Sequence, residues 1–148
     1  MTLQEKMAVD LKQSLKGGAK TRVSALRLVR AGVQNAEIAK GAPLDDAGVI
    51  DIIAREVRQH RESIAEFAKG NRQDLVAKEE AELATLLEYL PKQMSREEVV
   101  AAAREVMEQV GAQGPGDKGR VMSQLMPQLK GKADGREVSD VVAELLTG

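Results

Sequence analysis

The strongest constraint on the fold is a regular apolar spacing within residues 46–69. Six positions along this stretch are separated by three, four, three, four and three residues: Ile50, Ile53, Val57, His60, Ile64 and Phe67. This spacing places their side chains along one side of an α-helix and forms a heptad-like seam about five turns long. A helix with such a seam buries it against another helix. The stretch therefore predicts a helical-bundle protein.

Helix-start and helix-stop signals divide the first part of the chain. Thr2 and Glu5 form a predicted capping box for a first helix, which ends at the glycine pair 17–18. A second helix is expected to end at Gly41, and Asn71 or Asp74 is expected to cap a fourth helix that stops before the "YLP" segment. The pattern thus predicts an all-α fold, beginning with a four-helix amino-terminal unit.

A domain boundary is expected at Pro91, because the residue before a proline is disfavoured in the α region. Ser95 and Glu98 then form a second predicted capping box. The expected division is an amino-terminal domain, a linker and a carboxyl-terminal domain, at residues 1–90, 91–93 and 94–148. Three short helices are expected in the second domain, at about 95–110, 117–129 and 135–146.

Glycine, aspartate and proline set the expected ends of these short helices. Gly111 and Gly131 suit left-handed positions after helix carboxyl ends, and Asp117 and Asp134 suit the amino-terminal caps that follow. Pro127 would remove a backbone hydrogen bond inside its helix. A kink or an early helix end is therefore expected near residue 127.

Composition excludes several functional classes. The 148 residues contain no cysteine, which excludes disulfides, thiolate catalysis and Cys-based metal sites. No apolar run reaches the roughly 20 residues that cross a bilayer, and no signal peptide is recognisable, so a soluble cytoplasmic protein is expected. The net charge of −1 gives no indication of a nucleic-acid partner. Residues 1–40 are nevertheless locally basic, with eight basic and three acidic residues.

No catalytic constellation is recognisable. His60 is the only histidine and lies in the apolar seam, where a structural, interhelical role is the simpler interpretation. The "GAQGPGDKG" segment departs from a phosphate-binding loop because Asp117 follows its second glycine. The acidic run that contains Glu79, Glu80 and Glu82 is interpreted as a solvated helix face. We therefore expect no catalytic residue, no metal site and no cofactor.

The carboxyl-terminal "LKGKADGR" segment is the best local clue to a partner. Residues 115–136 contain five basic and two acidic residues. Glycines and helix amino termini nearby would let a phosphate backbone approach closely. The alternative interpretation is a solvated turn whose cations cap helices. The candidate phosphate-contacting residues, which the family resemblance described next makes RNA-binding candidates, are Lys118, Arg120, Lys130, Gly131, Lys132, Gly135 and Arg136.

Two runs carry a resemblance to a known family. They are "GNRQDLVAKEEAELATLLEYLPKQMS" and "GDKGRVMSQLMPQLKGKADGREVSDVVAELL", and with them essentially the whole chain resembles the GatB/YqeY family. The specific features are an "R-x-D-L-x-x-K-E-x-x-E-L" run ending in "YLP" and the "GRVM…LKGKADGREV" block. Lys118 departs from the methionine often found there.

The resemblance implies a stand-alone protein similar to the tail of the B subunit of the tRNA-dependent glutamyl/aspartyl amidotransferase. In that enzyme the tail is a helical appendage that contacts tRNA, and the catalytic parts lie elsewhere. The resemblance therefore implies a tRNA-binding or amidotransferase-associated module, with an amidotransferase or an aminoacyl-tRNA synthetase as a protein partner.

Several alternatives stay open at this point. One is participation in carbon–nitrogen ligation with glutamine as nitrogen donor, and another is a protein-docking module without RNA contact. A secondary basic surface is expected at Lys20 and Arg27. With Phe67 and Tyr89 as the only aromatic residues, base stacking is not expected, and neither are DNA specificity and membrane binding.

Overall fold

The computed structural model describes residues 1–148 and contains no strand, which confirms the all-α fold class. Its elements are α1 (Leu3–Lys16), α2 (Lys20–Lys40), α3 (Asp46–Lys69), α4 (Gln73–Leu87), α5 (Arg96–Val110), the 3-10 turn η1 (Pro115–Asp117), α6 (Lys118–Leu129) and α7 (Gly135–Thr147). They form two compact units, Met1–Leu90 and Pro91–Gly148.

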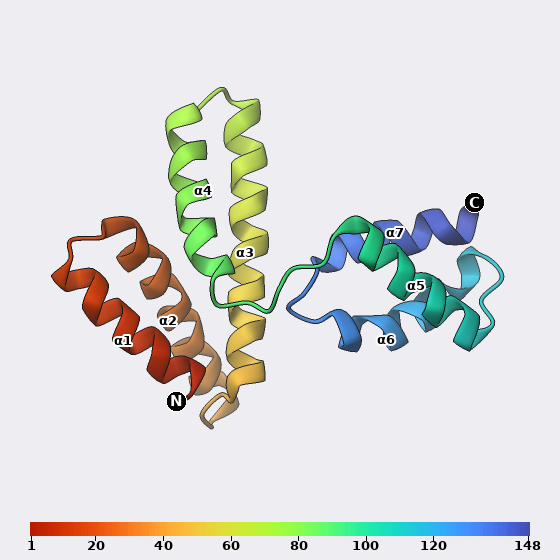
Figure 1. The fold of residues 1–148 in the computed structure, drawn as a ribbon, viewed down its shortest axis with the longest axis horizontal. Helices are drawn as coiled ribbons and strands as arrows, with labels where there is room; N and C mark the ends of the chain where they lie inside the picture. The colour runs from red at the N-terminus through yellow and green to blue at the C-terminus, as the bar shows by residue number, and fades with distance from the viewer. The chain divides into compact units, whose positions relative to one another are not determined.

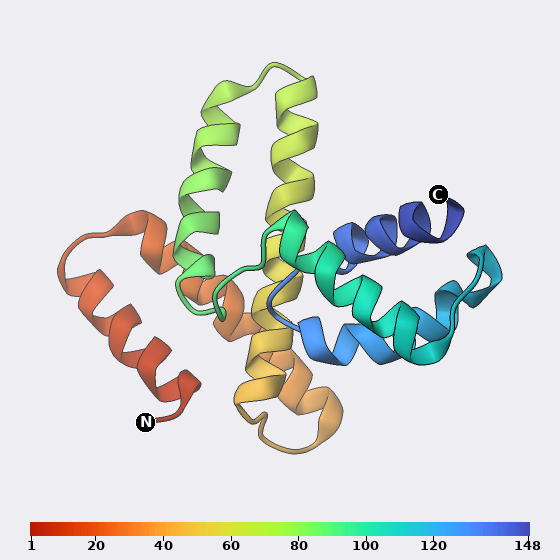
Figure 2. The same ribbon diagram turned by 45° about the vertical axis from the view of Figure 1, so that its right-hand side comes forward.

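The first unit is built around an antiparallel pair of helices, α3 and α4, which lie side by side in both views (Figure 1 and Figure 2). α2 packs against both members of this pair, and α1 packs mainly against α2. The expected seam of α3 is the side that faces the core, because Ile53, Val57 and His60 are buried there. Leu26 and Leu86 meet it from α2 and α4.

The second unit is a three-helix domain in which α5, α6 and α7 each pack against the other two. Its core is separate from the first and consists mainly of valines and leucines. The fully buried members include Val99, Val106, Val121, Leu125, Val138 and Val142. Each helix supplies its apolar side to this core, as the spacing of three and four residues requires.

Most predicted helix ends are confirmed. Both capping boxes are formed, at Thr2 with Glu5 and at Ser95 with Glu98. Gly41, Gly111 and Gly131 adopt the left-handed conformation, and Asp134 caps α7 by accepting a hydrogen bond from the Arg136 amide. These signals involve only neighbouring residues, which explains why they can be read from sequence.

The expected cap of α4 is wrong. The capping position is occupied by Arg72, which makes no side-chain capping bond, and Asn71 instead adopts a left-handed conformation with φ of 57°. Asp74 lies inside the first turn, where its carboxylate pairs with Arg72 at 3.1 Å. The ion pair and the tight turn after α3 replace the side-chain cap.

Two further expectations in the second unit are met only in part. Asp117 occupies the N-cap position of α6, as predicted, but its side chain makes no capping bond; its carboxylate instead accepts hydrogen bonds from the amides of Gln113 and Gly114, at 2.9 and 3.4 Å, and so closes the preceding turn. Of the two outcomes predicted at Pro127, the early helix end is not observed: α6 continues to Leu129, in agreement with the predicted bounds of about 117–129. Pro127 thus lies in the last turn.

Residues 91–148 expressed alone are expected to remain helical, because their core is complete within the second unit. A domain of this size is marginal in stability, so a low but cooperative melting transition is expected. Circular dichroism of the fragment during heating measures this. A fragment without helical signal at low temperature would show that the second unit depends on the first.

Candidate functional site

The candidate RNA-binding residues separate into two groups at opposite ends of α6. Lys118 and Arg120 lie in its first turn, whereas Lys130 and Lys132 follow its carboxyl end and Arg136 lies in the first turn of α7. A helix of twelve residues is about 18 Å long. The structure therefore brings together Lys130, Lys132 and Arg136, which we call the connector group, and separates Lys118 and Arg120 from it.

The backbone beneath the connector group is held by hydrogen bonds to the segment before α5. The carbonyl of Gly131 accepts a bond from the Gln93 side-chain amide at 2.8 Å, and the carbonyl of Lys132 accepts one from the Met94 amide at 2.9 Å. Gly131 is buried and has a φ of 77°, a conformation that glycine adopts without strain. The conformation of the turn therefore explains why a glycine stands at position 131.

All three connector-group side chains are exposed on this fixed turn. Arg136 also stands at the amino end of α7, where backbone amides and the helix dipole favour an anion. Asp134 already accepts from one of those amides at 3.0 Å, which reduces the local positive charge. The arrangement can contact phosphate through long, solvated cationic side chains.

Gly135 opens α7 and is not required by the fold. Its φ is not positive, and an added Cβ would lie 3.6 Å from the Met126 Cε, an ordinary contact. An alanine would therefore fit there.

Lys118 and Arg120 are less suited to phosphate contact. The Arg120 guanidinium pairs with Asp117 at 2.9 Å, and Lys118 is half-buried. The amides of Gln113 and Gly114, together with Arg120, hold the pKa of the Asp117 carboxyl below its usual range, so Asp117 stays charged. Part of the positive charge at this end of α6 is thus already balanced.

The secondary basic residues belong to the first unit. Lys20 and Arg27 are both exposed on α2, seven positions apart and therefore on the same side of that helix. Arg22, between them, is committed to an ion pair with Glu88. Arg22 therefore adds less positive charge to this secondary basic surface than the sequence suggests.

Neither aromatic ring offers a platform for bases. Tyr89 is 7% exposed and its hydroxyl donates to Asp10, while the Lys6 ammonium lies 5.5 Å from the ring centre. Burial and the neighbouring Asp10 raise the pKa of the Tyr89 hydroxyl, so it remains a neutral donor. Phe67 is half-buried near the end of α3. Any recognition of RNA would use its backbone and shape.

The sequence did not reveal a polar cluster around His60. The Nε2 atom of the buried ring lies 2.9 Å from Glu82 Oε2 and 3.5 Å from Glu79 Oε2, both on α4. Its Nδ1 donates to the Glu56 carbonyl at 2.8 Å. Ser24 on α2 donates to the other oxygen of Glu82 at 3.1 Å. The cluster thus joins three helices of the first unit.

The electrostatics of the cluster follow from these contacts. Burial of the His60 ring opposes its protonation, but the hydrogen bonds to Glu82 and the Glu56 carbonyl, with the charges of Glu79 and Glu82, outweigh it and raise the pKa of His60. Glu82 is 4% exposed and Glu79 half-buried, so the interpretation of the acidic run as a solvated face is wrong for these two residues.

A signal for this cluster was present in the spacing of α4. Glu79 and Glu82 follow Val76 by three and six positions and precede Leu86, so they continue the apolar side of the helix. A carboxylate on a core-facing side needs a buried polar partner. The only histidine occupies the corresponding side of α3.

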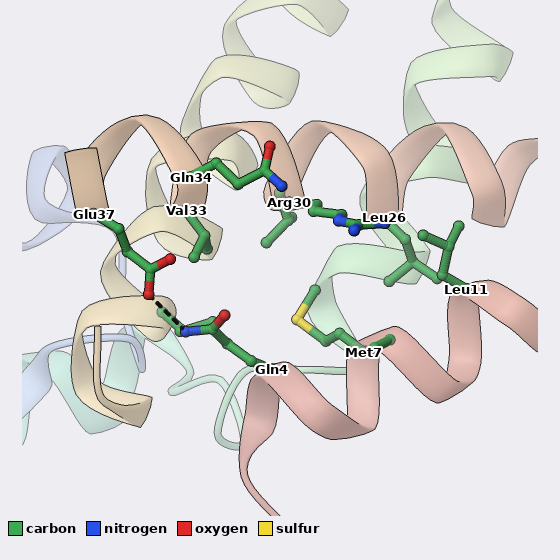
Figure 3. A pocket seen from close by; sticks show the side chains of 11 residues that line it. Gln4, Met7, Leu11, Leu26, Arg30, Val33, Gln34 and Glu37 are labelled. Atoms are coloured by element: carbon green, nitrogen blue, oxygen red, sulfur yellow. Dashed lines mark hydrogen bonds between the residues drawn. The ribbon is translucent and has the colours of Figure 1, made fainter. Parts of the chain in front are cut away.

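A pocket of about 310 Å³ lies between α1 and α2 (Figure 3). Met7, Leu11 and Val33 contribute apolar surface to it, and the Gln4 amide donates to Glu37 across one end at 3.2 Å. Glu37 also accepts from the Leu44 amide. Its charge is used to hold the loop before α3, and the lining offers no pair of groups for acid–base chemistry.

The fold is that of an all-α protein with two compact helical units. The model of the family described as Yqey-like protein matches residues 4–146. The chain therefore belongs to the Yqey-like protein family.

The curated relatives carry the name "Altered inheritance of mitochondria protein 41, mitochondrial". The protein from Pyrenophora tritici-repentis is 29% identical over 147 residues, which are 95% of this chain and 79% of the relative. Those from Lachancea thermotolerans and Saccharomyces cerevisiae (strain YJM789) are 37% and 33% identical over 82 residues, 55% of this chain and 44% of each relative. None of the helices of this chain has the length and apolarity needed to cross a membrane.

Proposed function

We propose that the chain is a tRNA-binding module that contacts the phosphate backbone through the connector group. The observation that carries the proposal is the placement of three exposed cations, Lys130, Lys132 and Arg136, on one hydrogen-bonded turn beside the amino end of α7. A turn with a fixed backbone presents cations at defined positions. The family resemblance to a tRNA-contacting tail supports the choice of partner.

Binding of this kind reads the shape and backbone of folded RNA. Tyr89 is buried, so it offers no face to an unstacked base. An amidotransferase or an aminoacyl-tRNA synthetase is the protein partner in this proposal, since both handle tRNA. We propose a cytoplasmic location for this chain, whereas the relatives carry a mitochondrial name.

Changing Lys130, Lys132 and Arg136 together to Gln is expected to weaken tRNA binding and to flatten its salt dependence. Each phosphate contact releases counterions, so the slope of log K against log salt should fall by roughly two to three units if all three residues touch phosphates. Stability should change little, because exposed charges contribute about 0–1 kcal/mol each. Fluorescence anisotropy with labelled tRNA at several salt concentrations measures the slope.

The matched control removes equal charge elsewhere, by changing Lys12, Lys16 and Lys40 to Gln. All three side chains are exposed in the first unit. Equal weakening by both triple variants would show generic attraction and contradict a site at the connector. Absence of salt-dependent binding by the unmodified chain would leave protein docking as the better function.

A further inference from the structure

The cluster formed by His60, Glu79 and Glu82 has the composition and spacing of a metal site. One imidazole nitrogen and one oxygen from each carboxylate all lie within 4.8 Å of one another. Around a tetrahedral Zn²⁺ with bonds of about 2.0–2.2 Å, neighbouring ligand atoms are about 3.3–3.5 Å apart. The Nε2–Glu79 separation of 3.5 Å matches that value, and the Nε2–Glu82 separation of 2.9 Å is a hydrogen-bond length that would increase by about 0.4 Å around the ion.

The hydrogen bonds around the cluster orient its ligand atoms inward. Because a carbonyl can only accept, the His60 Nδ1 carries a proton and donates to Glu56, which leaves Nε2 facing the carboxylates. Ligating histidines usually donate their second N–H in this way. Ser24 likewise engages Oε1 of Glu82 and leaves Oε2 facing His60.

The charge of the cluster also suits a cation. Glu79 and Glu82 form ion pairs with His60 and with no lysine or arginine. Even with a protonated ring, two carboxylates leave a net negative charge in a mostly buried place, where uncompensated charge is costly. A divalent ion would neutralise both carboxylates.

The cluster is closed on one side and open on the other. His60 and Glu82 are each 4% exposed, whereas the Glu79 side chain is 22% exposed. Three ligands and one solvent-facing side leave a fourth position for water or a ligand atom. Imidazole as one of three donors favours a transition metal over Mg²⁺ or Ca²⁺, which prefer oxygen.

We propose that His60, Glu79 and Glu82 bind one divalent transition-metal ion of the Zn²⁺ class in the first unit. Both glutamates belong to the "K-E-x-x-E-L" run quoted above, and the site is independent of the connector group. This proposal also replaces the expectation that the chain has no metal site. That expectation considered only partners of His60 on its own helix, whereas Glu79 and Glu82 lie on α4.

The test uses the full chain without a polyhistidine tag, stripped with a chelator and titrated with Zn²⁺ in excess Mg²⁺ by calorimetry. One equivalent per chain is expected. Because His60 is the only histidine, nitrogen NMR of the imidazole should show a larger shift at Nε2 than at Nδ1 on saturation.

Glu79→Gln is the decisive variant, because Glu79 is the most exposed ligand and its change disturbs the fold least. Zn²⁺ affinity should fall about tenfold or more, whereas the exposed neighbour Glu80→Gln should bind as the unmodified chain does. Equal effects of the two variants, competition by Mg²⁺, or an unchanged imidazole spectrum would each overturn the proposal and leave a structural imidazole–carboxylate pair.

Discussion

The Leu125→Ala variant is expected to unfold the second unit while the first remains folded. Leu125 is fully buried at the centre of α6, and removing a buried leucine side chain typically costs about 2–5 kcal/mol. Domains have about 0.05–0.15 kcal/mol of stability per residue, so the unit Pro91–Gly148 has about 3–9 kcal/mol. For a small unit near the lower end of this range, the loss removes most or all of its stability.

Hydrogen exchange resolved by helix measures this outcome. The amides of α5, α6 and α7 should lose protection, and those of α2, α3 and α4 should retain it, because the two cores are separate. Gln124→Ala, one position away and exposed, is the matched control and should change stability by less than about 0.5 kcal/mol. Simultaneous loss of protection in all helices would show that the units fold as one.

The helix ends of the second unit were already indicated by the sequence. The capping box at Ser95 and Glu98, the left-handed glycines at 111 and 131, and the cap at Asp134 are all local, and each formed as expected. A helix end is decided by a few neighbouring residues and their hydrogen bonds, so it can be predicted without knowing the tertiary structure.

The local predictions that are wrong or met only in part share a physical reason. Asn71, Asp74 and Asp117 each have a side chain that can cap a helix, but each has competing uses within a few residues. Asp74 pairs with Arg72, and Asp117 closes the turn through the Gln113 amide. Sequence identifies the residue types that form such bonds and does not decide between alternative partners.

The His60 cluster could not be assembled from the sequence because it depends on helix pairing. The heptad-like spacing of α3 shows that its apolar side meets another helix, and it leaves open which helix and in what register. Only the packing of α3 against α4 brings Glu82, 22 positions later, to 2.9 Å from the ring. The connector group differs, since its three cations are close in sequence.

The second large effect is expected at the pair formed by His60 and Glu82, in buffer with a metal chelator. Glu82→Leu alone leaves the buried Nε2 atom without its 2.9 Å partner and Ser24 without its acceptor. Breaking a buried pair by removing one member typically costs about 3–5 kcal/mol. The free energy of unfolding of the first unit should fall by that amount.

The His60→Leu/Glu82→Leu double variant should recover most of this loss, because both polar groups are then replaced by apolar side chains that suit the surrounding core. Denaturant unfolding of all four members of the cycle gives the coupling energy, which should exceed about 1.5 kcal/mol. Glu80→Leu, exposed on the same helix, controls for the loss of a carboxylate. If the two single losses simply add in the double variant, the 2.9 Å contact contributes no specific stabilisation, and the packing of the surrounding helices alone holds the two side chains together.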